Sequence, residues 1–408
     1  METSTLAESR IGGAIEIRLE DMTADPHGVF RHYRPLTAAL KAGPTYYLLR
    51  ARDVISLMTD TRTRQFDGAI MPLRGYPATG AMADFMTYSL LLSNDEVHRR
   101  RRKPLARSFA RPVMEPMRQY VREEAERLAD ALPRGSDFDF LEHFASPLPG
   151  RVIATTAGLE RDDWQRFASL IYRMTSGFAP PFPADRWPSI ESAAQDMYRF
   201  VAESIEDRRK SPREDFVTTF LKAATEAGEL SEIEIRSQLL AVLLGGSDTT
   251  RGALASMQGV LLEHPEQWQA LCRDPGLMQG AIDEALRFEP PVASTPRMAG
   301  EALTLDGIDI EAGSPLELMT MSAMRDPELY PDPDRFDIRR TGLPKIHPVF
   351  GGGTHRCIGE YLARMELEEG LRAVAARHPQ MRLVGDRPQP GGFSAVREAK
   401  PIIVHIPA

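Results

Sequence analysis

The sequence predicts a mainly helical domain with small β-sheets, and three observations support this fold class. Long stretches in the middle of the chain repeat apolar residues at helical spacing. Strand patterns are few and short. No repeat recurs at a fixed period, and 408 residues with 42% hydrophobic content are enough for one large buried core. We therefore expect residues 1–408 to form a single domain without a fused reductase.

Three segments carry the helical pattern most clearly: residues 114–132, 230–264 and 276–291. The middle segment begins with Ser231 and has Glu234 three residues later, which is the pattern of a capping box. Its apolar residues cover most of the helix circumference near the centre. We therefore expect this helix to run through the core.

Strand signals are confined to two places. Residues 303–318 alternate in polarity, and Asp306 followed by Gly307 is a strong hairpin signal. Residues 401–406 form a second short, apolar, β-branched run. Both predict small sheets beside a helical core.

Charge and composition exclude several classes of protein. A net charge of −8 argues against a nucleic-acid-binding protein. No apolar run reaches the roughly 18 residues of a membrane span, and residues 1–25 lack a signal-peptide pattern. Only two cysteines are present, so a disulfide framework is implausible. We expect a cytoplasmic protein with neither a nucleic acid nor a membrane as partner.

One of the two cysteines, Cys357, follows the run "VFGGGTHR" and precedes a helical pattern. A helix N-terminus favours an anion, here a thiolate. A buried structural cysteine, a phosphate loop, a zinc site and a nucleophile assisted by His355 are the alternatives. The glycine run lacks the Lys-Ser/Thr ending of a phosphate loop, and no second cysteine is near enough for zinc.

The combination of Phe350, Gly353, Cys357 and Gly359 at this spacing resembles the haem-binding loop of the soluble bacterial cytochromes P450. The resemblance implies a helical domain around a buried haem b, with Cys357 as the axial thiolate ligand of its iron. A thiolate ligand favours cleavage of the O–O bond. The resemblance also implies that the cofactor contacts Phe350, Gly351, Ile358, Gly359 and Ala363.

The stretch "LLGGSDTT" lies in the centre of the long apolar helix. Glycine and threonine are poor helix formers, and Asp248 needs compensation in a buried stretch. Close packing of a second helix would also explain the glycines. The resemblance implies instead that the helix opens over the haem, that Gly245 and Gly246 make room for O2, and that Asp248 and Thr249 deliver protons.

Four residues match the family's positions for holding the haem propionates: His98 and Arg102 in "HRRRRK", then Arg297 and His355. His98 and Arg102 are four residues apart, so they share one helix face. Pro104 suggests a kink or an end to that helix. A solvated helix face is the alternative interpretation of the basic run.

The remaining cations of that run are Arg99, Arg100 and Lys103. We expect them to face solvent on the cysteine side of the haem. There they would steer an acidic ferredoxin, which the resemblance implies as electron donor together with a ferredoxin reductase.

A second structural motif is "EALR", with Glu284 and Arg287 three residues apart. It resembles the family's Glu-x-x-Arg pair. Arg335 in "PDPDRF" is the residue that the resemblance adds to this pair, in a role that stabilises the fold behind the haem.

The resemblance implies a monooxygenase that inserts one atom of O2 into a small, largely apolar organic substrate, with electrons from NAD(P)H. A peroxide-driven peroxygenase and a nitric oxide reductase on the same fold are alternatives, as is a non-catalytic haem sensor. None of the three has the same use for Asp248 and Thr249.

Three segments are expected to surround the substrate: residues 70–92, residues 172–187, and residues 292–295 with Phe393. They are rich in Met, Phe and Leu, which suits an apolar molecule. Arg74 and Arg173 are candidates for binding an acidic group of the substrate.

Overall fold

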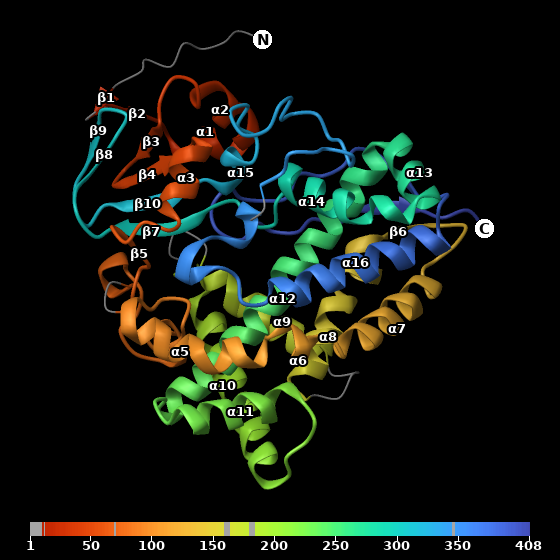
Figure 1. Cartoon of the computed structure of the whole chain (residues 1–408), viewed down its shortest axis with the longest axis horizontal. Coiled ribbons are helices and arrows are strands. Elements are labelled where there is room, and N and C mark those ends of the chain that lie inside the picture. Colours follow the sequence, from red (N-terminus) through yellow and green to blue (C-terminus); the bar gives the residue numbers. More distant parts are fainter. Residues whose placement is uncertain (1–9, 12, 69–70, 159–163, 179–183, 345–346) are drawn as a thin grey trace.

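The structure, a computed structural model, describes residues 10–11, 13–68, 71–158, 164–178, 184–344 and 347–408. Most strands gather at one end of the molecule, and helices fill the rest (Figure 1). The predicted fold class, mainly α with small sheets, is confirmed.

The helices are α1 (Leu19–Ala24), α2 (Pro26–Tyr33), α3 (Ala51–Leu57), α4 (Ala81–Tyr88), α5 (Asp95–Ser108), α6 (Arg111–Met114), α7 (Met117–Asp130), α8 (Pro147–Thr156), α9 (Trp164–Thr175), α10 (Trp187–Lys210), α11 (Phe216–Ala227), α12 (Glu232–Glu263), α13 (Pro265–Arg273), α14 (Met278–Phe288), α15 (Thr320–Ala323) and α16 (Glu360–Arg377). The strands are β1 (Arg10–Ile11), β2 (Ala14–Glu16), β3 (Ala39–Ala42), β4 (Thr45–Leu48), β5 (Thr63–Arg64), β6 (Asp137–Asp139), β7 (Thr295–Ala299), β8 (Leu303–Leu305), β9 (Ile308–Ile310), β10 (Pro315–Leu318), β11 (Arg382–Leu383) and β12 (Ile403–His405).

The largest sheet has the strand order β1-β2-β3-β4-β10-β7-β5, and a smaller one joins β11, β12 and β6. The predicted hairpin forms as β8–β9, with Leu305 opposite Ile308. Its turn residues, Asp306 and Gly307, have φ angles of 52° and 79°. Two consecutive positive φ angles are what a tight two-residue hairpin turn requires.

The long helix α12 runs through the core, as predicted. Both hydrogen bonds of the capping box between Ser231 and Glu234 are present. Leu240 and Leu243 are fully buried. Helices α4, α8, α10, α14 and α16 pack around α12. This central position explains why α12 is apolar on nearly all sides.

Helix α5 does not end at Pro104. The proline is buried inside the helix, which continues to Ser108, and the Ser108 hydroxyl donates a hydrogen bond to the Pro104 carbonyl at 3.1 Å. The packing of α5 against α11, and the burial of Leu105, outweigh the low helix propensity of proline here.

Candidate active site

The loop before α16 gives each glycine of its run a specific function. Gly351 and Gly353 have φ angles of 70° and 61°, a backbone region that other residues rarely adopt. A Cβ on Gly352 would lie 3.1 Å from the Cβ of Met58, so the loop also packs closely against the chain after α3. Within the loop, the Cys357 N–H donates to the Phe350 carbonyl at 2.8 Å. These contacts fix the backbone that carries Cys357.

Cys357 lies two residues before Gly359, the N-cap of α16. Burial raises the pKa of its thiol, while the Gly359 N–H and the nearby guanidinium groups of Arg102 and Arg356 lower it. The residue is nevertheless exposed. Cys357 is therefore surrounded by protein and still open to a ligand.

The predicted cofactor-contacting residues beside Cys357 are close to it along the chain. Phe350 is half-buried beneath the guanidinium of Arg364, 5.0 Å from the ring centre. Ile358 is half-buried, and the Ala363 N–H donates to the Gly359 carbonyl at 2.9 Å in the first turn of α16. The structure thus places these side chains around the start of one helix.

Four cationic or donor groups, predicted from three separate stretches, come together. The rings of His98 and His355 lie 4.0 Å apart, centre to centre. Arg297 is only 2% exposed and donates to the carbonyl of its own neighbour, Pro296. Arg102 donates to the Arg356 carbonyl at 2.6 Å.

Burial lowers the pKa of each group in this cluster. The pKa of Arg297 falls to about 10. The pKa of His98 falls to about 4 and that of His355 to about 3, first by burial and then by repulsion among the cluster's own groups. The buried Nε2 of His98 has no hydrogen-bond partner.

Within the described part of the chain, no carboxylate pairs with His98, Arg102, Arg297 or His355. Native proteins rarely bury such groups without an acceptor. The cluster therefore fits a ligand that brings its own carboxylates next to Cys357. The two propionates of haem meet this requirement.

The centre of α12 differs from the expectation in two ways. The helix is continuous from Glu232 to Glu263 and does not open locally. A Cβ on Gly246 would lie 2.5 Å from Ile153 of α8, so Gly246 allows close helix packing and does not make room for O2. A Cβ on Gly245 would instead meet nothing within 4 Å, and Gly245 is exposed inside a buried helix.

Thr249 and Asp248 are directed to different partners. The Thr249 hydroxyl donates to the Gly245 carbonyl at 3.1 Å, so it lies beside the open space at Gly245. The Asp248 carboxylate accepts from Arg251 at 2.6 Å, and both side chains are mostly buried. The sequence did not single out Arg251, because Arg at this helical spacing usually makes a surface pair.

The family described as Cytochrome P450 matches residues 68–274 and 276–375. The chain belongs to the cytochrome P450 family.

Similar proteins support this assignment across most of the chain. Cytochrome P450-pinF1, plant-inducible, from Rhizobium radiobacter is 38% identical over 96% of this chain and 92% of its own. Luteothin monooxygenase from Streptomyces thioluteus is 32% identical over 83% of each chain. The solved structure of myxobacterial cytochrome P450 CYP267B1 with myristic acid is 29% identical, has a TM-score of 0.84, and matches 94% of this chain and 97% of that one.

This cytochrome P450 is therefore an enzyme of the monooxygenase class, and its family implies a haem-iron cofactor. None of its described helices is long and apolar enough to span a membrane. We call His98, Arg102, Arg297 and His355 the cation cluster. Together with the Cys357 loop, these residues have the chemistry that a haem requires.

The buried pair of this P450 is present, but its third member was predicted incorrectly. Glu284 and Arg287 are fully buried and joined by two hydrogen bonds of 2.7 and 2.8 Å. The predicted partner Arg335 is 69% exposed and lies 3.3 Å from Asp337. Arg340 reaches Glu284 instead, at 3.0 Å. Arg335 contributes only its carbonyl, which accepts from Arg287 and Arg340.

The prediction that three cations of the basic run face solvent is wrong for Arg100, whose side chain is 27% exposed, but agrees with the exposed side chains of Arg99 and Lys103. Their position on the cysteine side of the haem stays a prediction. Arg100 donates to Glu234 at 2.9 Å, and Lys103 lies 3.6 Å from Glu229, so both face the α11–α12 connection. Arg99 is exposed and pairs with Glu96. Arg101, which was not predicted, is buried and also binds Glu234. The periodicity of α5 distributes these side chains around the helix.

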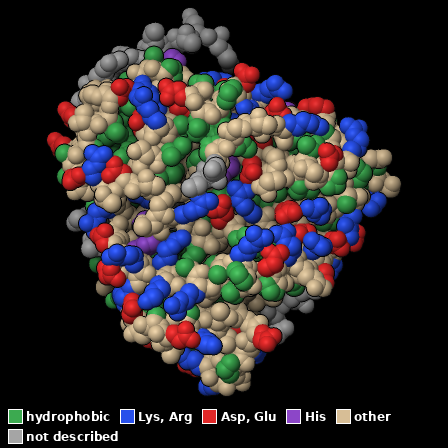
Figure 2. Space-filling view, in the orientation of Figure 1, with side chains coloured by type: hydrophobic (Ala, Val, Ile, Leu, Met, Phe, Trp, Pro, Cys, Tyr) green, Lys and Arg blue, Asp and Glu red, His purple; other side chains and the backbone are tan. Residues whose placement is uncertain are grey.

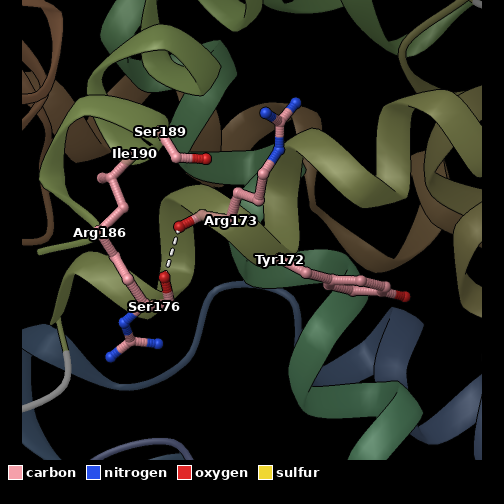
Figure 3. Close-up of a pocket in the computed structure, with 6 residues that line it drawn as sticks. All are labelled: Tyr172, Arg173, Ser176, Arg186, Ser189 and Ile190. Atoms are coloured by element: carbon pink, nitrogen blue, oxygen red, sulfur yellow. Dashed lines mark hydrogen bonds between the residues drawn. The ribbon is translucent and has the colours of Figure 1, made fainter.

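The segments expected around the substrate are described in part. Residues 69–70 and 179–183, and the side chain of Arg74, lie outside the described part. A cavity of about 300 Å³ is lined by side chains of α9, α10 and their connection, including Arg173 and Arg186, whose guanidinium groups point to opposite sides (Figure 3). Phe393 packs 6.0 Å from the Tyr47 ring.

Proposed function

We propose that this P450 binds haem b and inserts one atom of O2 into a small, largely apolar organic substrate. Haem iron supplies the activation of O2. The observation that carries the proposal is the cation cluster, in which the two arginines Arg102 and Arg297 lie beside the two histidines His98 and His355, with His98 and Arg297 buried. Among the described residues it has no acidic partner, and it adjoins a cysteine held at a helix N-terminus. Cys357 would hold the iron, and the cluster would hold the propionates.

Two electrons and two protons are needed per turnover, because the second oxygen atom leaves as water. Thr249 lies beside the open space at Gly245, where its hydroxyl would be placed to pass on a proton. Asp248 is the adjacent carboxylate and can receive protons from solvent. This pair favours a monooxygenase over a peroxygenase, a nitric oxide reductase or a sensor.

The electrons would come from NAD(P)H through a ferredoxin reductase and a ferredoxin. We infer a single-domain cytoplasmic enzyme that receives them from these separate proteins. Arg102 lies close to Cys357 along this side of the fold, since it contacts the carbonyl of Arg356, directly before the cysteine.

An apolar substrate is supported by several relatives. Proteins named steroid C26-monooxygenase are 31% identical to this chain, and the CYP267B1 structure contains a fatty acid.

Proton delivery can be tested with NAD(P)H, a surrogate ferredoxin and its reductase. Thr249→Ala should still consume NAD(P)H but release most electrons as hydrogen peroxide, whereas Asp248→Asn should turn over about a hundredfold more slowly. Thr225→Ala is the matched control, because Thr225 makes the same hydrogen bond to a carbonyl four residues earlier, on α11. Unchanged coupling in Thr249→Ala would contradict the proposal.

A further inference from the structure

Asp248 is held from the side that faces α9. Arg251, three residues further along α12, donates to its carboxylate at 2.6 Å. The same guanidinium lies 3.8 Å from the ring centre of Tyr172 on α9. The Tyr172 ring points away from the neighbouring Arg173 and Arg186 (Figure 3). Carboxylate, guanidinium and ring therefore form one stack between α12 and α9.

This arrangement leaves the Arg251 guanidinium few other partners among the described residues and the solvent. Its side chain is 16% exposed and that of Asp248 13%, so solvent hardly competes for either. The buried Nε of Arg251 has no hydrogen-bond partner. Its described contacts are the carboxylate and the aromatic face, both of which attract a guanidinium.

The periodicity of α12 shows what the stack does to Asp248. Gly245 and Thr249 are four residues apart and share a face, which borders the open space. Asp248 lies about 100° around the helix from Thr249, between this face and the face of Arg251. The direction of its carboxylate is therefore set by whichever group holds it, and that group is Arg251.

We propose that Arg251, seated on the Tyr172 ring, is a positioning residue that fixes the Asp248 carboxylate for proton delivery. The inference rests on the proposed function, in which Asp248 receives protons from solvent. It adds that α9 takes part through one aromatic ring.

The aromatic ring of Tyr172 holds Arg251, and its hydroxyl does not take part in this contact. The buried hydroxyl oxygens of Tyr172 and Ser247 lie near each other, but neither has a hydrogen bond of good geometry. Tyr172→Phe should therefore leave proton delivery unchanged. Tyr172→Leu removes the aromatic face and should impair proton delivery as Arg251→Gln does.

The test uses the haem-loaded enzyme with NAD(P)H, ferredoxin and reductase, without organic substrate. Under these conditions O2 takes up two electrons and two protons to form hydrogen peroxide, or four of each to form two waters. Water formation is measured as NAD(P)H oxidised beyond the peroxide released. We expect it to fall about tenfold in Arg251→Gln and Tyr172→Leu, since small misplacements of a reacting group have large effects on rate. Arg251→Lys should recover most of the rate.

A crystal structure of each variant gives a readout independent of turnover. The Asp248 carboxylate should change direction in Arg251→Gln and Tyr172→Leu and keep it in Tyr172→Phe. Arg199→Gln is the control, because Arg199 and Asp196 form an exposed pair of the same spacing on α10, at 2.9 Å.

The outcomes separate this inference from the proposed function. If Arg251→Gln forms water as fast as the unmodified protein while Asp248→Asn turns over slowly, the role of Arg251 is overturned. Full activity of Asp248→Asn overturns the relay itself. If Arg251→Gln does not fold, Tyr172→Leu and Tyr172→Phe decide, and equal rates in these two variants overturn the inference.

Discussion

At Cys357, opposing effects act on one sulfur atom. Burial favours the neutral thiol, and Gly359 and two arginines favour the thiolate. A bound metal ion decides such a balance, because coordination removes the proton outright. In the nearby cation cluster, Arg297 is buried without an acidic partner in the described structure, an arrangement that favours an anionic ligand.

The first prediction follows from this balance. Cys357→His should keep part of its haem, since the cation cluster still holds the propionates, but it should lose the long-wavelength carbonyl band of the reduced thiolate form. Absorption spectra of the reduced protein with carbon monoxide measure this. Cys272→Ala is the control: burial raises the pKa of this half-buried thiol to about 11, so it stays neutral. Retention of the band in Cys357→His would show that another residue binds the iron.

At the scale of elements, α14 is joined to the segment after α15 by buried charges. Glu284 accepts from Arg287 and Arg340 and also from the Asp337 N–H at 2.9 Å. Arg287 donates to the Met324 carbonyl at 2.9 Å. Glu284 and Arg287 thus have additional partners from distant stretches, and removal of Arg340 leaves Glu284 with fewer donors.

Arg340→Ala should consequently destabilise the protein by about 2 kcal/mol, because hydrogen bonds to a charged group contribute roughly 1.5 to 3 kcal/mol and Glu284 keeps its pair with Arg287. Arg335→Ala should change stability by less than about 0.5 kcal/mol, because its side chain is exposed. Urea denaturation monitored by circular dichroism compares the two. If both changes lower the free energy of unfolding equally, the Arg335 side chain contributes to this charge network after all.

The short helical turn before the Cys357 loop should make stability depend on pH. Burial holds the pKa of His347 at about 4, and its Nδ1 accepts from the Val349 N–H at 3.3 Å. A lowered pKa means that the folded state disfavours the proton, so this contribution is complete above pH 6.5. It is lost as pH falls from 6.5 toward 4, at about 1 kcal/mol per pH unit.

Denaturation midpoints at pH 7 and pH 5 measure this loss. His347→Gln should show a smaller difference between the two pH values than the parent protein, although it is less stable at pH 7. Identical pH dependence in both proteins would assign the effect to other groups.

At the scale of the whole molecule, the net charge is −8, yet one face carries both basic and acidic side chains. Figure 2 shows Lys and Arg side chains across the face that carries α5 and α16, with acidic side chains between them. Many of these cations are paired, as Arg100 and Lys103 are. Arg111 is 77% exposed, lies 3.9 Å from Glu115 and sits over the ring of Tyr361, four residues after Cys357. It is therefore a better candidate than the predicted run for contact with ferredoxin.

Arg111→Glu should raise the apparent KM for ferredoxin a few-fold at low salt, and the difference should shrink as ionic strength rises. Arg107→Glu is the matched control, since Arg107 is exposed but faces Glu226 of α11 at 3.6 Å. Steady-state titration with ferredoxin at several salt concentrations decides between them. An equal effect of both changes would mean that only net charge matters.

Local sequence patterns determined the fold class, the capping box of α12, the β8–β9 hairpin and the position of Cys357 before a helix. Each of these depends on residues within a few positions of one another, where backbone preferences and periodicity act directly. Tertiary structure decided which charges meet. Arg340, and not Arg335, pairs with Glu284, and Arg100 pairs with Glu234. Gly246 lies against Ile153, and the Arg251 guanidinium lies over the Tyr172 ring. Long flexible side chains and helix–helix contacts are selected by the packing of distant segments, and a linear spacing does not specify that packing.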